Sequence, residues 1–257
     1  MSSPGLMRIQ QILARAGIAS RRHSEDLIRE GRVTLAGQLI TSPGIRIGPD
    51  QYPDLRIDGR RLLAPQRSIY ILLHKPGGFI SSTSDPQGRP TVLDLLPKGL
   101  PRLFPVGRLD FHTEGLLLLT NDGPLTHLLL HPRFHVPKVY EVKVQGIPGP
   151  SSLRLLCEGI GSEGERMWAI RAEILRRGTK NAWLLMEVSQ GKYHQIRRMC
   201  ESIGHPVLKL KRISFGPIQL GRLPRGRWRL LKPKEVDLLR RLTAASPDLP
   251  KKGASSD

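Results

Sequence analysis

The N-terminal part of the chain shows two successive spacings of hydrophobic positions. The helical spacing, which places apolar residues on one face, occurs at Ile9, Ile12, Leu13 and Ala16. Gly17 follows this pattern, and Ser20 is a suitable N-cap for a second helix that runs to Gly31. An alternating spacing then begins at Val33 and continues on both sides of Ala36-Gly37, which predicts a β-hairpin.

The rest of the chain shows more strand-like than helix-like runs. Strand-like runs occur at residues 69–73, 140–144, 168–174, 183–188 and 207–213. Helix-like runs occur at residues 125–130, 151–158, 195–203 and 234–242. Because the two kinds of run do not alternate regularly, the pattern favours an α+β fold with a mainly antiparallel sheet over a doubly wound fold.

These patterns divide the chain into three parts. Residues 8–66 are expected to form a small N-terminal α/β module, and residues 67–242 a larger second domain. Residues 243–257 are rich in Ser, Pro, Lys and Ala, which predicts a disordered tail. A length of 257 residues suits two domains. The core is expected to be mainly Leu, Ile and Val, since aromatic residues make up only 5% of the chain.

The charge of the chain indicates a polyanionic partner. Lys and Arg total 41 against 22 Asp and Glu, a net charge of +19. Such a charge opposes folding by self-repulsion, and it makes sense if the usual partner is nucleic acid. A membrane is the weaker alternative, because no apolar run approaches the ~20 residues that a span requires. With no apolar signal segment at the N-terminus and no motif around Cys157 and Cys200, we expect a cytoplasmic protein with reduced thiols.

One segment offers a carboxylate for chemistry. Asp110 follows Arg108 in a predicted turn, just before an apolar run at residues 116–119. An acid that stays ionised in a partly dry pocket needs a cation nearby. An Arg–Asp pair that caps a surface turn is the more common explanation of such a motif, so this segment alone does not decide between the two.

Two further segments gather cations. Arg21 and Arg22 stand in the first turn of the second predicted helix, where guanidinium and backbone N–H groups could bind a phosphate. A solvated helix end explains them equally well. Between His205 and Arg241 the chain has eleven Lys and Arg against two acids. This density favours a surface that tracks phosphates over a merely solvated basic face.

Two apparent motifs fail on their context. Residues 159–164 fit G-x-G-x-x-G, but they follow a predicted helix and precede a predicted strand, the reverse of the dinucleotide-binding order. His127 and His131 could share a metal, but no obvious third ligand accompanies them. We therefore expect neither a cofactor nor a metal.

Several motifs together resemble one family. Gly107-Arg108-Leu109-Asp110, with the following Thr-Glu-Gly-Leu-Leu, closely resembles the catalytic motif of the RNA pseudouridine synthases. Residues 75–78, 138–140 and 191–199 match further motifs of that family, and the resemblance runs from about Met7 to about Leu231. Residues 8–66 resemble the S4-like RNA-binding module of its ribosomal branch, with Ala36 where relatives commonly have Asn.

The resemblance implies an activity and a set of site residues. The family breaks the bond from ribose C1′ to uracil N1 and remakes it to C5, here in ribosomal RNA, with 23S favoured over 16S. It implies Asp110 as nucleophile or as base of a glycal mechanism, Tyr140 as the active-site tyrosine, and Arg197 as the cation that pairs with Asp110. The other residues expected to bind substrate or RNA are Arg108, Lys75, Arg21, Arg22, Lys192, His194, Arg198, Lys209, Lys211 and Arg212.

Two rival functions use some of the same features. A non-catalytic RNA-binding or ribosome-assembly protein would have the same basic surfaces, but it would have no use for an acid in its RNA cleft. An RNA hydrolase would need paired carboxylates or metal ligands, which the sequence does not offer. We expect ribosomal RNA or a pre-ribosomal particle as the partner, and a monomeric chain.

Overall fold

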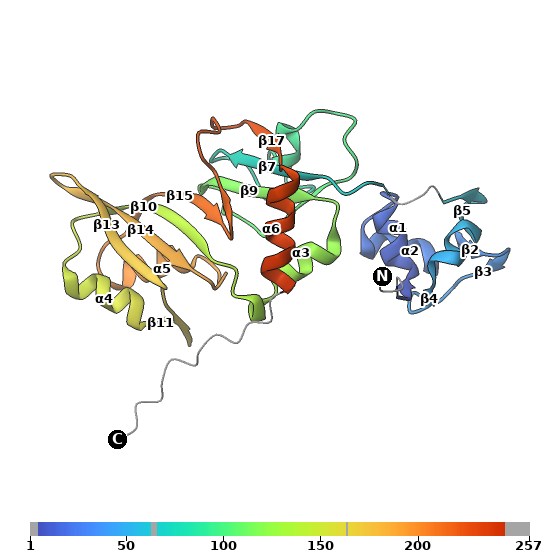
Figure 1. Ribbon diagram of the computed structural model, residues 1–257, viewed down its shortest axis with the longest axis horizontal. Helices are drawn as coiled ribbons and strands as arrows, with labels where there is room; N and C mark the ends of the chain where they lie inside the picture. Colours follow the sequence, from blue (N-terminus) through green and yellow to red (C-terminus); the bar gives the residue numbers. More distant parts are fainter. Residues whose placement is uncertain (1–4, 63–65, 163, 245–257) are drawn as a thin grey trace, which may run out of the picture. The chain divides into compact units, whose positions relative to one another are not determined.

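The computed structural model describes residues 5–62, 66–162 and 164–244 (Figure 1). Backbone contacts separate them into two units. The first unit contains the N-terminal residues as far as Ile69, together with Gly99–Arg102 and Asn121–Gly123. The second unit contains the remaining described residues. The predicted tail begins at residue 243, but the last helix continues to Ala244, and residues 245–257 lie outside the described residues.

The first unit combines two helices with short strands. Ser20 caps α2 as predicted, because its Oγ accepts a hydrogen bond from His23 N at 3.1 Å. The predicted hairpin is also present, with Ala36 at φ +49° and Gly37 at φ +83°. Ala36 is therefore held in the left-handed region that a side chain disfavours. The elements are β1 (Met7–Arg8), α1 (Ile9–Arg15), α2 (Arg21–Arg29), β2 (Val33–Leu35), β3 (Gln38–Leu39), β4 (Arg46–Ile47), η1 (Pro49–Asp54), β5 (Leu55–Ile57) and β6 (Arg60–Arg61).

The second unit is built on one large sheet. Among the described residues this sheet has nine strands in the order β13-β14-β10-β15-β9-β7-β17, with β16 beside β15 and β8 beside β9. The pairs are antiparallel except β15 with β9. The strands are β7 (Tyr70–Lys75), β8 (Phe104–Pro105), β9 (Glu114–Thr120), β10 (Lys138–Gln145), β13 (Arg171–Arg177), β14 (Asn181–Val188), β15 (Val207–Phe215), β16 (Ile218–Gln219) and β17 (Trp228–Leu230). This architecture confirms the predicted α+β class.

Helices and shorter elements complete the second unit. Leucines of α3 and α6 pack against Leu72, Leu116 and Leu118 of the sheet, and this cluster forms a core under α6 (Figure 1). The predicted helices are present, although the strand expected at residues 168–174 begins only at Arg171. The remaining elements are α3 (Gly123–Leu130), α4 (Pro150–Glu158), α5 (Gln195–Ser202), α6 (Pro233–Ala244), η2 (Val92–Leu95), η3 (Pro132–Phe134), β11 (Ile160–Ser162) and β12 (Glu165–Met167).

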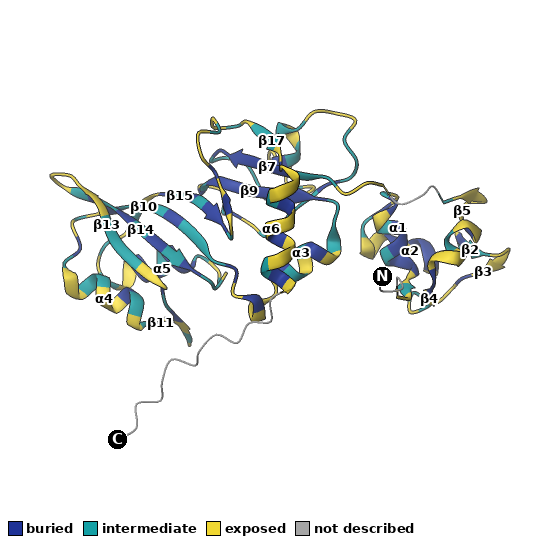
Figure 2. Ribbon diagram, viewed as in Figure 1, coloured by how far each residue is buried: buried dark blue, intermediate teal, exposed yellow. Residues whose placement is uncertain are grey.

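Burial differs between the two ends of the large sheet. Strands β7 and β9 are buried along almost their whole length, whereas β14 alternates strictly between buried and half-buried residues (Figure 2). Strict alternation is typical of a strand that is covered on one face only. None of the helices in the described part of the chain is long and apolar enough to cross a membrane.

Candidate active site

A cavity of about 710 Å³ lies in the second unit. This volume falls within the range of small-molecule sites. Its wall draws on the turn before β9, the start of β10, the segment that enters α5, and the end of β15. The three residues expected to be catalytic, Asp110, Tyr140 and Arg197, all line it. The structure thus brings together side chains that lie far apart in the sequence.

The turn that carries Asp110 is held by a buried serine. Ser81 Oγ donates a hydrogen bond to Leu109 O at 2.8 Å and accepts one from Leu109 N at 3.1 Å. Asp110 O in turn accepts a hydrogen bond from Thr113 N at 3.0 Å, which closes the turn. The backbone on both sides of the carboxylate is therefore fixed. Sequence reasoning did not find Ser81, because nothing local distinguishes it from other loop serines.

Lys75 holds the same turn from the other side. Its side chain is fully buried, 0% exposed, at the end of the interior strand β7. This corrects the expectation that Lys75 contacts RNA, since its ammonium faces the turn and not solvent. Desolvation lowers the pKa of Lys75 to about 8, against the opposing charges of Asp110 and Glu114. Nζ donates to the backbone oxygens of Pro76 (3.1 Å), Asp110 (3.0 Å), Phe111 (3.4 Å) and Thr113 (2.8 Å).

A glycine lets β9 lie against β15 directly after this turn. Gly115 adopts φ +111° and is opposite Arg212 in the parallel register. A Cβ at this position would lie 2.6 Å from Arg212 N and would collide with Arg212 O. Any side chain would therefore force the strands apart, so Gly115 keeps the Asp110 turn next to the cavity wall.

Tyr140 and Arg212 are neighbours across the sheet and both line the cavity. Arg212 is only 2% exposed, which corrects the expectation that it belongs to a basic outer surface. Its Nε donates to Leu116 O at 2.8 Å, and its guanidinium carbon lies 5.3 Å from the centre of the Phe215 ring. Its Nη2 is a buried donor that has no hydrogen-bond partner among the described residues.

Lys138 also belongs to the cavity wall, although sequence reasoning assigned it no role. Its Nζ donates to Val136 O at 2.9 Å and to Ser189 O at 3.0 Å. Burial, and then the charge of Arg212, lowers the pKa of Lys138 to about 8. A signal was present in the sequence, because Lys138 and Tyr140 are two residues apart on one strand and must share a face.

The segment that enters α5 brings a histidine close to Asp110. His194 adopts φ +47° before the helix begins, and its Nε2 lies 3.7 Å from Asp110 Oδ1. Among the described residues neither Arg197 nor Arg108 forms an ion pair with Asp110, although both line the cavity. The expected Arg197–Asp110 pair is thus not formed in this structure. The side chain of Asp110 is 37% exposed, so water can solvate its charge without a paired arginine.

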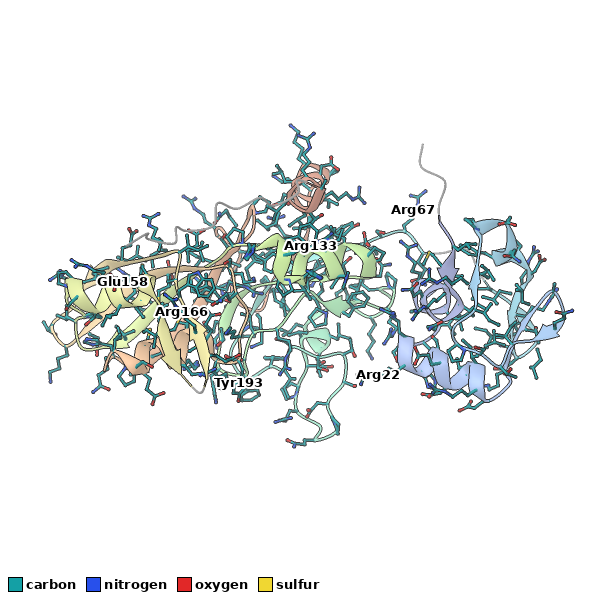
Figure 3. The ribbon with its side chains drawn as sticks, turned by 90° about the horizontal axis from the view of Figure 1, so that it is seen from below. Arg22, Arg67, Arg133, Glu158, Arg166 and Tyr193 are labelled. Carbon is teal, nitrogen blue, oxygen red and sulfur yellow. The ribbon has the colours of Figure 1, made fainter. Side chains whose placement is uncertain are left out.

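The rim of the cavity carries an exposed aromatic ring. Tyr193 is 73% exposed and points outward (Figure 3). Its ring stacks on the imidazole of His194, with centroids 3.9 Å apart and 16° between the planes. Sequence reasoning did not single out Tyr193, since an exposed tyrosine before a helix has no distinctive local pattern.

The other residues expected to bind RNA are divided between ion pairs and exposed surfaces. Lys192 and Arg198 both contact Glu165, at 3.6 and 2.9 Å, and the side chain of Arg198 is only 12% exposed. Their charges are therefore partly balanced within the fold. Lys209 and Lys211 project from the sheet face opposite to Tyr140 and lie away from the cavity. Arg21 and Arg22 are exposed on α2 in the first unit; Figure 3 labels Arg22 there.

Comparison with known proteins identifies the class. The family model for RNA pseudouridylate synthases matches residues 69–202, and the S4 domain model matches residues 7–51. An uncharacterized RNA pseudouridine synthase of Aquifex aeolicus (strain VF5) is 41% identical over 231 residues, 90% of this chain and 92% of the relative. Ribosomal large subunit pseudouridine synthase B of Bacillus subtilis (strain 168) is 40% identical over 238 residues, 91% of this chain and 96% of the relative.

A solved structure agrees with these sequence relatives. The crystal structure of a pseudouridylate synthase superimposes with a TM-score of 0.63 at 28% identity, covering 91% of this chain and 99% of that one. The chain therefore belongs to the RNA pseudouridylate synthase family and carries an S4 domain. It is an RNA pseudouridine synthase, which confirms the resemblance drawn from the motif around Asp110.

Proposed function

We propose that this chain converts a uridine of large-subunit ribosomal RNA into pseudouridine, with Asp110 as the attacking group. The observation that carries the assignment is the composition of the cavity wall. Among the described residues that line it, Asp110 is the single carboxylate, and it stands among five Lys and Arg: Arg108, Lys138, Lys192, Arg197 and Arg212. A lone fixed acid in a cationic cavity is suited to attack one point of a polyanion.

The chemistry requires a nucleophile and a place for negative charge. A carboxylate oxygen of Asp110 attacks ribose C1′, the C1′–N1 bond breaks, and its electron pair stays on the uracil. The uracil turns, C5 attacks C1′, and the carboxylate leaves. The proton on C5 is then lost, and N1 takes up a proton. In the glycal alternative Asp110 removes a ribose proton instead of attacking C1′, and the same cavity serves both routes.

Arg212 is placed to stabilise the displaced base. The leaving uracil carries negative charge that its two carbonyl oxygens share. Arg212 lines the cavity, and its buried Nη2 donor has no partner among the described residues. A buried donor that gains a charged acceptor recovers its desolvation cost, and such preorganised groups lower barriers where charge develops.

The target uridine must leave its helix or be unpaired before it enters this cavity. Flipping a base costs a few kcal/mol. Stacking on an aromatic ring contributes ~1–3 kcal/mol per base, and Tyr140 in the wall offers such a ring. Phosphate contacts of the S4 domain and of the basic surfaces would supply the rest. The assignment to the large subunit rests on the relative from Bacillus subtilis, whose name specifies that subunit.

Asp110→Asn tests the nucleophile. The variant should form no pseudouridine in transcribed 23S rRNA fragments, because covalent catalysis fails when its nucleophile is removed. Its affinity for the same RNA should stay within about twofold of wild type. Glu141→Gln is the matched control, since it makes the same change on the opposite sheet face and should keep wild-type turnover. Turnover by Asp110→Asn well above background would refute the role of Asp110.

The RNA target needs a separate experiment. Pseudouridines should be mapped in the ribosomal RNA of cells with and without the gene. A position lost from 23S rRNA only, and restored by the wild-type chain but not by Asp110→Asn, is the expected result. Loss from 16S rRNA would move the target to the small subunit while leaving the chemistry intact.

A further inference from the structure

Strands β13, β14, β10 and β15 form a part of the sheet with two unlike faces. Helix α5 covers one face, where Cys200 Sγ lies 3.8 Å from Met186 Sδ. Tyr140 is opposite Met186 in the register, so it points to this same closed face. The intervening residues point the other way and are half-buried or exposed (Figure 2). We call this second side the open face, and it lies across the sheet from the cavity.

A row of cationic and aromatic side chains crosses the open face. The strand register places four residues directly opposite one another, one on each strand. This basic row consists of Arg176 on β13, Trp183 on β14, Lys143 on β10 and Lys209 on β15. With neighbouring strands ~4.8 Å apart, the row spans roughly 14 Å.

The charges of the basic row are not balanced within the fold. Among the described residues none of its three cations forms an ion pair. In the adjacent row, by contrast, the charged residues form ion pairs. Lys211 Nζ lies 4.0 Å from Glu141 Oε2, and Glu173 Oε1 lies 2.6 Å from Arg171 Nη2. Arg177 and Lys180, exposed at the hairpin between β13 and β14, add two more cations at the same end of the sheet. Local positive charge is therefore concentrated here.

The basic row also offers flat groups. The guanidinium carbon of Arg176 lies 5.1 Å from the centre of the Trp183 ring. Proteins recognise unpaired RNA bases by stacking them on aromatic rings and on guanidinium planes, while nearby cations contact the phosphates. A merely solvated basic face needs no aromatic ring between its cations. The alternation of cation and ring therefore favours a nucleic acid over an acidic protein as the occupant.

We propose that the basic row binds a single-stranded segment of RNA away from the target uridine. Trp183 and Arg176 stack on one base, and Lys143 and Lys209 contact the phosphates beside it. This site goes beyond the proposed isomerisation, because it lies on the face of the sheet opposite to Asp110 and Tyr140 and takes no part in chemistry. It would bind a second region of the RNA substrate while the cavity holds the uridine.

A 12-nucleotide oligoadenylate tests this site with the full chain. It contains no uridine, so it separates the open face from the isomerisation reaction. Binding should quench tryptophan fluorescence, and Trp183→Phe should remove most of the quenching. Lys143→Gln/Lys209→Gln should weaken binding about 25-fold at about 0.1 M salt, because each lost phosphate contact on a single strand lowers the salt slope by about 0.7.

The matched control is Arg60→Gln/Arg61→Gln, which removes two exposed cations from β6 in the first unit. It should change the affinity no more than about twofold. Absence of oligoadenylate binding to the wild type, or equal losses in the two double variants, would overturn the proposal. So would quenching that persists in Trp183→Phe. A dimer in sedimentation that only Lys143→Gln/Lys209→Gln dissociates would assign the open face to a second copy of this chain instead.

Discussion

The Asp110 turn and the start of α2 hold their functional groups in opposite ways. The turn is fixed by buried hydrogen bonds from Ser81 and Lys75, so its backbone has little freedom. Arg21 and Arg22 are exposed, and the cap at Ser20 fixes their backbone but not their side chains. One region is preorganised down to individual atoms, and the other presents charge on long side chains.

The difference matches the two proposed tasks, which are bond chemistry at the Asp110 turn and phosphate binding at the start of α2. Making and breaking a bond at C1′ needs the reacting atoms within about 3–3.5 Å in the correct orientation. Phosphate binding relies mainly on charge and counterion release, so a mobile guanidinium can follow its target. Substitutions in the turn should therefore act on the catalytic rate, and substitutions at α2 on affinity.

Lys75→Met should break the preorganised region most severely. Without the ammonium, the oxygens of Thr113 and Pro76 lose their donor and the turn can shift. A displacement of about 1 Å at a reacting group costs about 10²-fold in rate, so kcat should fall by about that factor while RNA affinity changes little. Single-turnover kinetics measure the rate, and a thermal melt checks the fold. A folded variant with wild-type kcat would show that Lys75 does not position Asp110.

The titration of Lys75 should make both the stability and the catalytic rate depend on pH. The amine loses its proton near pH 8 in the folded chain, against 10.5 for an ordinary lysine. The unfolded state therefore binds more protons between these values, and the free energy of unfolding should rise with pH across this window. The neutral amine has one donor fewer for the turn, so the rate should fall as stability rises. Lys75→Met should remove the contribution of Lys75 to the pH dependence of both stability and rate. The contribution of Lys138, whose pKa is also lowered, should remain. Unchanged pH dependence of both quantities in this variant would contradict the account.

Local patterns predicted the elements but not the orientation of buried cations. The cap at Ser20 and the alternating strands were predicted because helix caps and face periodicity depend on residues that are close in the sequence. Lys75 was expected to bind substrate or RNA, and Arg212 was counted in a basic surface, because charged residues are rarely buried unpaired. Their burial depends on neighbouring strands that are distant in sequence. The sequence did contain a signal for the burial of Arg212, because a position two residues from the apolar Leu210 on one strand points to the same face. Leu210 and Ser214 are both buried in β15.

The ionic surroundings of Asp110 were also beyond sequence reasoning. The motif implied a pair with Arg197, whereas among the described residues only His194 lies within ion-pair distance of the carboxylate. The left-handed backbone at His194 turns the chain into α5 and brings the imidazole to Asp110. The residue order does not predict which side chain at the start of this basic helix lies closest to Asp110. Differences of about 1 Å in the tertiary structure decide that.

Arg197→Met tests how far a neighbouring cation supports Asp110. Arg197 lines the cavity without pairing with Asp110 in this structure, and we expect the two to pair once RNA excludes water from the cavity. Loss of the cation should then lower kcat about 10- to 100-fold, between the effects of exposed and buried ion pairs. Arg197→Lys is the matched control and should recover most of the rate. If His194→Gln lowers kcat more than Arg197→Met does, the histidine is the more important partner of Asp110.

Arg21→Gln/Arg22→Gln should affect binding and leave chemistry intact. The salt slope of RNA affinity should fall by about 1.4–1.8 and the affinity about 25- to 60-fold at about 0.1 M salt, with kcat unchanged at saturation. Arg60→Gln/Arg61→Gln removes two exposed arginines from the same unit and serves as the control. A fall in kcat at saturating RNA would mean that the two regions are not separable as described.

Tyr193→Ala should give the smallest effect, because Tyr193 combines features of both regions. Its ring is 73% exposed, yet it stacks on His194, which contacts Asp110. Loss of a stacking surface for a base beside the target uridine should raise KM about fivefold, the lower end of the ~1–3 kcal/mol measured for such stacks. Tyr193→Phe keeps the ring and should behave as wild type. A fall in kcat with unchanged KM would show instead that the ring acts by orienting His194 toward Asp110, which would place Tyr193 with the preorganised groups.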